Sequence, residues 1–561
     1  MKKRLISAMM AAVMVLTAVG CSTAPEGAES SQGGSSDANS SSSTSEETAS
    51  GGEEYTGDMV RLSDEPVTLS MFLSFDSSRF TTVSNYAELP CQIRMTEITN
   101  VQPEYIHPAA GSEKEQLNLL LSSGDLPDII YYDWSTFSST PDQMYEDGLI
   151  IDLTDLIAQY AVNTNALIEE NPQIKKDITT DNGLMPCFYQ MQFSEPLKNT
   201  YAYLIRADWL EQVGKDVPVT LDDWYDVLCA FRDNDMNGNG DPSDEYPFVS
   251  GMFNDNGDVH GMELFYSAWG KYWKMYVNED GHAAYGAYDP DYKEYLLLMR
   301  QWIEEGLFDP DFATIDKTQQ DARFLNSQSG ATRSGLGAGF GTYIAGLGDE
   351  NAIVAAMSPV MNEGDVSYNF EGYSAGVTKN GAVITTNCEI PEIATKWLDM
   401  YYGGDGMMLA NYGIEGESYT MVDGYPTLSD YIMRNPDGKS INVAISEFSL
   451  GAASFPYWND SAVREQRMLS YPAQEECSKE MAKMDTSRII PNISLTADET
   501  SEYSAIISEV ETYVKETVLA FLLGQQDIET GFDTYMQTLK DLGVEDAIAI
   551  YDAALQRYYA R

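Results

Sequence analysis

The chain has 561 residues, and its 88 Asp and Glu residues outnumber its 33 Lys and Arg residues to give a formal net charge of −55. Such a chain repels phosphate backbones and excludes nucleic-acid binding, whereas a polycationic partner stays open beside a simply solvated acidic surface. A chain of this length is too long for one hydrophobic core, so two large lobes are expected.

The first 20 residues have the pattern of an export segment. Basic residues at positions 2–4 precede an apolar run at 5–19, which is too short for a comfortable transmembrane helix. The stretch 18–21 (AVGC) resembles a bacterial lipobox, which implies cleavage after residue 20 and a lipid, such as palmitate, on Cys21. Ordinary secretion without a lipid is the alternative.

Residues 21–60 are predicted to be a disordered linker that follows the lipidated cysteine. Ser, Gly, Thr, Ala and Glu dominate this stretch, which has almost no large apolar side chain to offset the entropy cost of ordering. No Lys or Arg lies between Arg4 and Arg61, so the lipid rather than charge must hold the protein at a membrane.

Helices and short apolar strands alternate through the rest of the chain. Ser112 and Glu115 form a predicted capping box for a helix that ends at Gly124, and residues 126–132 form a predicted buried strand. The alternation predicts α/β lobes with largely parallel sheets.

Three further helices have start signals in the sequence. Thr220 and Asp223 form a second capping box, Asp289 precedes a helix that ends at Gly306, and Pro391 opens another. The last sixty residues are predicted to be mostly helical. Helical spacing places three tryptophans in the core: Trp224, Trp302 and Trp397.

Several catalytic patterns can be excluded. Residues 372–376 match G-x-S-x-G, but all three His residues precede Ser374, whereas α/β-hydrolases need a later His. The glycine-rich run 335–341 lacks a phosphate-loop spacing, and three isolated His residues do not form a zinc site. Apart from Cys21, five scattered cysteines form no disulfide framework or C-x-x-C pair.

Residues 233–245 carry a possible calcium loop. Asp233 to Gly238 fit the D-x-[DN]-x-[DN]-G start of an oxygen-only loop, and Asp244 occupies the twelfth position, followed by Glu245. Pro247 interrupts the second helix that an EF-hand requires. A lone calcium loop is therefore predicted, and a solvated Asn/Gly/Asp turn is the alternative.

Four segments resemble the extracellular solute-binding proteins of ABC importers, family 1. They are residues 123–129 (SGDLPDI), 205–210 (IRADWL), 304–310 (EEGLFDP) and 411–420 (NYGIEGESYT), and the last resembles the subgroup of alginate-oligosaccharide binders. The resemblance covers roughly residues 65–561. It implies a two-lobed periplasmic-binding-protein-like (type II) clamshell with a hinge, in which the ligand lies between the lobes.

The resemblance also implies the boundaries of the two lobes and a set of calcium ligands. Lobe 1 would comprise residues 61–187 and 375–435, and lobe 2 residues 188–374 and 436–561. The subgroup's structural calcium site would fall, with one extra residue after Asn239, on Asp235, Asn237, Asn239, the carbonyl of Asp241, Asp244 and Glu245.

Aromatic side chains near Gly, Asn, Asp and Ser are the main ligand-binding candidates. An aromatic ring can lie on a sugar face while short polar groups bind its hydroxyls, although each ring can equally be part of the core. Arg206 can bind a ligand or form a structural ion pair with Asp208. The candidate residues are Trp134, Tyr189, Arg206, Trp269, Tyr343, Tyr373, Tyr412, Glu415 and Tyr419.

The predicted function is that of a substrate-binding lipoprotein, anchored to the outer face of the cell membrane. It is expected to be a monomer without enzymatic activity, which captures an oligosaccharide and delivers it to a permease driven by a separate ATPase. Two alternatives stay open: a peptide-binding importer component, and a surface glycosidase, whose carboxyl pair cannot be assigned among 88 acids.

Overall fold

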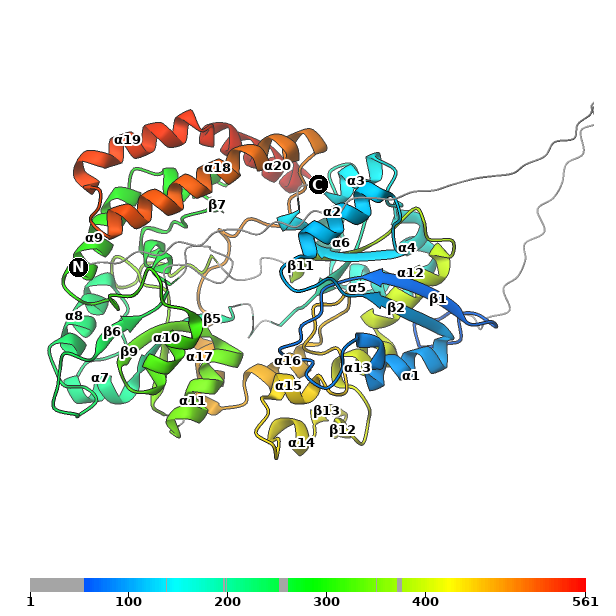
Figure 1. Cartoon of the computed structure of the whole chain (residues 1–561), viewed down its shortest axis with the longest axis horizontal. Coiled ribbons are helices and arrows are strands. Elements are labelled where there is room, and N and C mark those ends of the chain that lie inside the picture. Colours follow the sequence, from blue (N-terminus) through cyan, green and yellow to red (C-terminus); the bar gives the residue numbers. More distant parts are fainter. Residues whose placement is uncertain are drawn as a thin grey trace, which may run out of the picture. The chain divides into compact units, whose positions relative to one another are not determined.

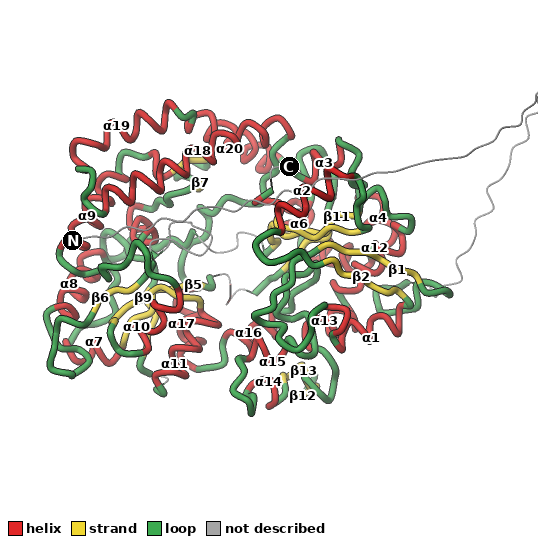
Figure 2. The backbone as a smooth tube through the Cα atoms, in the orientation of Figure 1, coloured by secondary structure: helices red, strands yellow, loops and turns green. Residues whose placement is uncertain are grey.

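Two β-sheets, each with helices on both faces, form two α/β lobes (Figures 1 and 2). The two-lobed α/β prediction is confirmed. The structure is a computed structural model, and it describes residues 55–137, 139–194, 197, 199–251, 261–349, 351–370 and 376–561.

The first lobe contains a five-stranded sheet in the order β2-β1-β3-β11-β4. Its strands are β1 (Val67–Phe72), β2 (Val101–Ile106), β3 (Ile129–Asp133), β4 (Phe188–Met191) and β11 (Val377–Ile384). Its helices are α1 (Pro90–Thr99), α2 (Glu113–Ser123), α3 (Pro141–Glu146), α4 (Thr154–Tyr160), α5 (Val162–Glu170), α6 (Pro172–Ile178), α12 (Pro391–Asp399) and α13 (Gly404–Tyr412).

Alternating side chains divide the first lobe between two cores, one on each face of the sheet. In β3, Ile129 and Tyr131 pack with α1, α4 and α12, whereas Ile130 packs on the other face with Leu117 of α2 and Met144 of α3. Successive strand residues point to opposite faces, so a strand buried on both sides is apolar throughout.

The second lobe contains a four-stranded sheet in the order β10-β5-β9-β6. The strands of this lobe are β5 (Tyr201–Arg206), β6 (Tyr246–Val249), β9 (Ser329–Gly335), β10 (Ile353–Ala356) and the separate pair β7 (Met275–Val277) and β8 (Ala283–Tyr285). Its helices are α7 (Ala207–Val213), α8 (Leu221–Arg232), α9 (Tyr292–Glu304), α10 (Lys317–Leu325), α11 (Gly341–Leu347), α17 (Pro472–Met481), α18 (Ala497–Leu522), α19 (Ile528–Asp541) and α20 (Val544–Ala560).

A small subdomain follows α13. It has a hairpin and three short helices: β12 (Tyr419–Val422), β13 (Tyr425–Leu428), α14 (Asp430–Met433), α15 (Ile441–Ile445) and α16 (Ser461–Met468). Leu450 and Phe455 pack in the first lobe's core, and β4 pairs with β11 of that lobe. The structure thus groups both stretches with the first sheet, whereas the sequence prediction began lobe 2 at residues 188 and 436.

Both sheets are mixed, so the prediction of largely parallel sheets is wrong. In the first lobe β11 runs antiparallel to β3 and β4, and in the second lobe β5 runs antiparallel to β9 and β10. Strand β5 enters the second lobe from the first, and β11 returns to the first lobe from the second, so neither strand arrives through a βαβ crossover within its own sheet. Such a crossover is what enforces parallel pairing.

The helix predictions have mixed outcomes. The Thr220–Asp223 capping box is confirmed, and α12 begins at Pro391 as predicted. The cap at Ser112 is wrong because its hydroxyl accepts from no backbone amide of the helix; it donates to the carbonyl of Ala109, 2.7 Å away, and accepts from the Gln116 side chain at 2.6 Å. The helix predicted from Asp289 begins at Tyr292, since the Asp289 carboxylate binds Lys271 at 2.6 Å and closes a preceding turn.

Other expectations agree with the described residues. The C-terminal segment forms α18, α19 and α20, and all three predicted core tryptophans are at most 1% exposed. The five cysteines beyond Cys21 are free thiols. Within the described ranges, no helix combines the length and apolar character that crossing a membrane requires.

A buried carboxylate joins three segments of the first lobe. Asp399, at the end of α12, is fully buried and accepts hydrogen bonds on both oxygens. Oδ2 accepts from the Tyr55 hydroxyl at 2.7 Å and the Asn163 amide at 2.8 Å, and Oδ1 accepts from the amide and hydroxyl of Thr164 at 2.8 and 2.6 Å. The chain itself therefore supplies the partners of both oxygens.

Candidate functional site

Two adjoining hollows lie where the chain passes between the sheets. The larger, here called the cleft, encloses about 590 Å³, and the smaller, called the cavity, about 190 Å³. Thr378, Lys379 and Asn492 line both. The two hollows therefore share a wall formed by these residues.

Backbone and amide hydrogen bonds hold the crossing segments together beside the cleft. The Gln192 amide donates to the Gly376 carbonyl at 2.7 Å, and the Asn459 amide donates to the Met191 carbonyl at 2.7 Å. Asn492 Nδ2 donates to the Val377 carbonyl at 3.0 Å. Four separate stretches of the chain meet at this wall, so a movement of the lobes would act directly on the cleft.

The cleft is lined by polar side chains and by one exposed ring. Tyr201, the first residue of β5, is 44% exposed, and the Arg333 guanidinium lies 4.8 Å from its ring centroid. Amide side chains of Gln190, Gln192 and Asn459 line the same hollow. An aromatic face with neighbouring amides is the combination that a sugar ring and its hydroxyls require.

The cleft is also basic. Arg79, Lys379, Arg464 and Arg467 line it, and among the described lining residues Asp133 is the one carboxylate. Burial lowers the pKa of Arg467 to about 10, with the neighbouring charges of Arg464 and Arg79 acting in the same direction. At neutral pH Arg467 remains protonated, so the positive charge persists.

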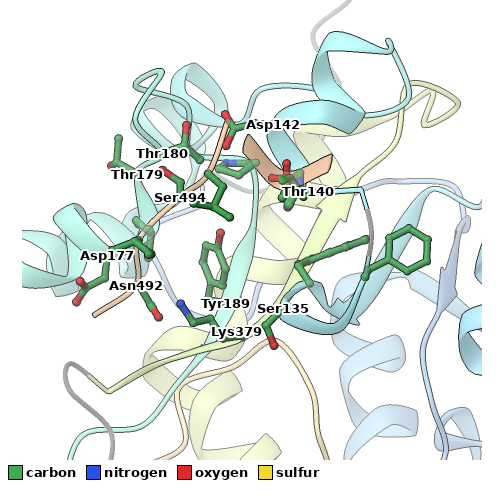
Figure 3. Close-up of a pocket in the computed structure, with 18 of the residues that line it drawn as sticks. Ser135, Thr140, Asp142, Asp177, Thr179, Thr180, Tyr189, Lys379, Asn492 and Ser494 are labelled. Carbon is green, nitrogen blue, oxygen red and sulfur yellow. The ribbon is translucent and has the colours of Figure 1, made fainter. Parts of the chain in front are cut away.

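The cavity has an acidic wall (Figure 3). Asp142 and Asp177 line it and are 4% and 5% exposed, and burial raises the pKa of both carboxyl groups. The ring of Tyr189 lies among the lining residues. Trp134 forms part of the wall, with its Nε1 donating to the Gly381 carbonyl at 2.9 Å.

Contacts from the C-terminal helices close one side of the cavity. Tyr503 of α18 and Tyr551 of α20 line it, and the Tyr558 hydroxyl donates to Asp177. Arg557 of α20 binds Asp181 at 2.5 Å and Glu499 at 2.6 Å. Helix α20 thereby connects the second lobe to the loop after α6 of the first.

Two of the predicted ligand-binding residues, Trp134 and Tyr189, lie together in the wall of the cavity. Arg206 does not line the cleft or the cavity: its Nε and Nη2 bind Asp208 at 2.8 and 2.5 Å, and its Nη1 binds Ser327 at 2.9 Å. Of the two alternatives for Arg206, the geometry is that of the structural ion pair.

The remaining candidates lie elsewhere. Tyr343 is buried on α11 with its hydroxyl on Asp321, Tyr412 is buried on α13 with its hydroxyl on Asp460, and Tyr419 packs against Tyr412 with ring centroids 5.3 Å apart. Trp269 packs beside Tyr266 and Tyr295, and Glu415 is exposed. Tyr373, like Ser374 and Cys21, lies outside the described residues.

Five oxygen-bearing side chains of the predicted calcium loop are close to one another. Asp244 accepts from Nδ2 of Asn237 at 3.3 Å and of Asn239 at 2.8 Å, and Asp235 Oδ2 accepts from the Gly240 amide at 2.8 Å. The Asp241 carboxylate instead accepts a hydrogen bond from the Ser243 hydroxyl at 2.6 Å.

Glu245 gives this loop an unsatisfied acceptor. Its Oε1 accepts from the Asn237 amide at 3.1 Å, whereas Oε2 is shielded from solvent and has no partner among the described residues. Burial raises the pKa of its carboxyl group, and Asp244 and Asp235 add to that effect. In the part of the chain that the structure describes, Asp, Glu, His and Cys alone form no metal cluster, so any site here depends on Asn oxygens as well.

Sequence comparison finds related proteins at modest identity. No family model matches the chain. It is 24% identical over 475 residues to the fructooligosaccharide ABC transporter substrate-binding protein FusA of Streptococcus pneumoniae, covering 80% of this chain and 83% of that protein. It is 25% identical over 362 residues to the lipoprotein LipO of Bacillus subtilis, covering 61% and 66%.

Solved structures match over nearly the whole folded part. FusA in complex with kestose matches with a TM-score of 0.71 at 22% identity, over 88% of this chain and 99% of that one. The chain has the fold of the solute-binding proteins. The alginate-binding protein AlgQ2, solved without calcium ion, matches with a TM-score of 0.69 at 20% identity, over 89% and 100%. Another FusA structure is described as an EF-hand mutant.

Proposed function

We propose that this protein is the substrate-binding component of an ABC importer and captures an oligosaccharide in the cleft. The observation that carries the proposal is the cleft itself, where the exposed Tyr201 ring stands beside the amides of Gln190, Gln192 and Asn459 at the junction of two lobes. The similarity to FusA, named for fructooligosaccharides, supports a sugar ligand.

Capture would work by closure of the lobes around the sugar. A ligand that contacts both lobes stabilises the closed form by the free energy of those additional contacts. The closed protein would then deliver the sugar to a permease that a separate ATPase drives. Binding without chemistry is in line with FusA and AlgQ2, which are named as binding proteins.

The test is titration calorimetry of the purified protein against a panel of oligosaccharides and a panel of extended peptides. Saturable sugar binding with a decrease in the radius of gyration in X-ray scattering is expected. Binding of peptides but not sugars would instead establish the peptide-importer alternative, and release of reducing ends would establish a glycosidase. Tyr201→Ala should weaken sugar binding by about 5-fold, since stacking contributes about 1 kcal/mol.

The proposal includes a lipid anchor at Cys21 on the outer face of the cell membrane. Its supports are the lipobox-like stretch 18–21 and the similarity to LipO, which is named a lipoprotein. A tethered monomer stays near its permease at a high effective concentration. Cys21→Ser should release the protein from the membrane fraction with unchanged sugar affinity, and a lost affinity would contradict the assignment.

A structural calcium ion in the loop 235–245 is also part of the proposal. The side chains of Asp235, Asn237, Asn239, Asp244 and Glu245 offer the hard oxygen ligands that calcium takes, and the unpartnered Oε2 of Glu245 fits a ligand position. The ion would supply positive charge to the loop and would stabilise the second lobe by binding its folded form.

A further inference from the structure

Helix α16 presents two arginines to the cleft. Arg464 and Arg467 are three residues apart, so their side chains project from the same face of the helix. Arg464 is 4% exposed, and it therefore contributes charge inside the protein rather than to the solvated surface. A field from buried charges of one sign, in a hollow with low-dielectric walls, attracts ligands of the opposite sign.

The acidic residues of the same helix have other partners. Asp460 caps α16 by accepting from the Ala462 amide at 3.0 Å, and it also receives the Tyr412 hydroxyl. Glu465 accepts from the Ser194 hydroxyl at 3.0 Å. Neither carboxylate forms an ion pair with the arginines of α16 among the described residues.

The decisive observation for the charge of the ligand is the hydrogen bonding of the Arg467 guanidinium. Its Nε and Nη1 are shielded from solvent and have no hydrogen-bond partner among the described residues. A buried charged donor without an acceptor is strongly unfavourable, so such a group implies a partner that the described residues do not supply. The contrast with Arg206 is direct, because three nitrogens of that buried guanidinium bind protein oxygens.

Arg79 approaches the same hollow from the first lobe. Its Nη1 donates to the Ala452 carbonyl at 2.7 Å, and its Nε lies 3.1 Å from the Asp76 carboxylate. These two contacts hold the guanidinium in place at the rim of the cleft. The three arginines thus come from two separate parts of the chain and meet at one hollow.

We infer that the cleft takes an acidic oligosaccharide, with Arg464 and Arg467 binding an oxyanion substituent on a sugar ring. The inference rests on the proposed function. A guanidinium matches a carboxylate with two parallel N–H donors, which favours a uronate, and a sulfate ester offers the same oxygen chemistry. Tyr201 would lie against the apolar face of the ring.

The test compares matched ligands on the unmodified protein. Calorimetry at low salt would measure trigalacturonate, its methyl ester and a sulfated neutral trisaccharide, with neutral trisaccharides alongside. We expect at least about 10-fold tighter binding of the uronate than of its ester, because hydrogen bonds to charged groups contribute about 1.5–3 kcal/mol. Preference for the sulfated sugar would assign the oxyanion to a sulfate ester.

Equal affinity for acid and ester, or binding of neutral sugars alone, would overturn the inference and leave the proposed function standing. Failure of every sugar, neutral and acidic, would overturn both. High salt should weaken binding of the acidic sugar and leave that of a neutral sugar nearly unchanged, since screening acts on the charged contact.

Variants locate the contact on α16. Arg464→Gln and Arg467→Gln should each lose at least about 10-fold in affinity for the acidic sugar and should lose clearly less affinity for a neutral sugar. Arg467→Lys retains the charge and should recover part of the loss. The control is Arg434→Gln, which removes a guanidinium that is 85% exposed. Melting curves confirm folding, and an equal loss for both sugars would contradict the role.

Discussion

Asp399 in the first lobe and the loop 235–245 in the second are both centred on carboxylates, yet they differ in what supplies the partners. Both oxygens of Asp399 accept hydrogen bonds from the chain's own donors. In the loop, Glu245 Oε2 is buried without a donor among the residues that the structure describes. A buried carboxylate stabilises the fold by itself when the chain donates hydrogen bonds to both of its oxygens. A buried carboxylate oxygen without a donor needs a bound cation to do the same.

Asp399→Ala is the change with the largest expected effect. It leaves the Tyr55 hydroxyl and the amides of Asn163 and Thr164 without acceptors, and we expect the free energy of unfolding to fall by about 3 kcal/mol or more. Urea denaturation followed by circular dichroism measures it. Asp437→Ala, at an exposed position, should change the free energy by less than about 0.5 kcal/mol. Equal losses of unfolding free energy in the two variants would contradict the structural role of Asp399.

Calcium should act on the loop and not on Asp399. At a free calcium concentration 100 times the dissociation constant, the folded protein should gain about 2.7 kcal/mol of stability, seen as a higher melting temperature that EDTA reverses.

Asp244→Asn should abolish that calcium response. The matched control is Asp241→Asn in the same loop, because the Asp241 side chain binds Ser243 and only its carbonyl is proposed as a ligand. A calcium response that survives in Asp244→Asn would move the ion elsewhere.

Asp181 is intermediate between Asp399 and the loop carboxylates. The chain supplies its partner, but that partner is an arginine far away in the sequence. Arg557→Ala removes the contacts to Asp181 and Glu499, but the arginine side chain is 35% exposed, so solvent screening limits the expected loss to about 1 kcal/mol. Thermal unfolding measures it. A more exposed pair serves as the reference: Lys483→Ala, which breaks a contact to Glu480, should have almost no effect on the melting temperature.

The sequence predicted correctly those helix starts that depend on only a few neighbouring residues. The Thr220–Asp223 cap and the proline start of α12 depend on a few neighbouring residues, and the structure has both. Mixed sheet directions depend on where the chain enters each lobe, which no short window contains.

The cleft was not predictable in the same way. Its lining comes from residue 79, the start of β5 and α16, which meet only through the tertiary fold. Tyr343 and Tyr412 have polar or glycine-rich neighbours in the sequence, but they lie on helices and point into cores. A glycine-rich context therefore did not separate a binding-site ring from a helix packed closely against its neighbours.

The arrangement of tryptophans gives the protein an intrinsic optical reporter. Five of its eight indoles, Trp209, Trp224, Trp273, Trp302 and Trp397, are fully buried and supply a constant fluorescence background. Trp134 lines the cavity, and Trp458 stacks on Phe193 with centroids 5.3 Å apart, next to the crossing segments. Emission changes on ligand addition would therefore come mainly from the rings near the junction, without an attached dye.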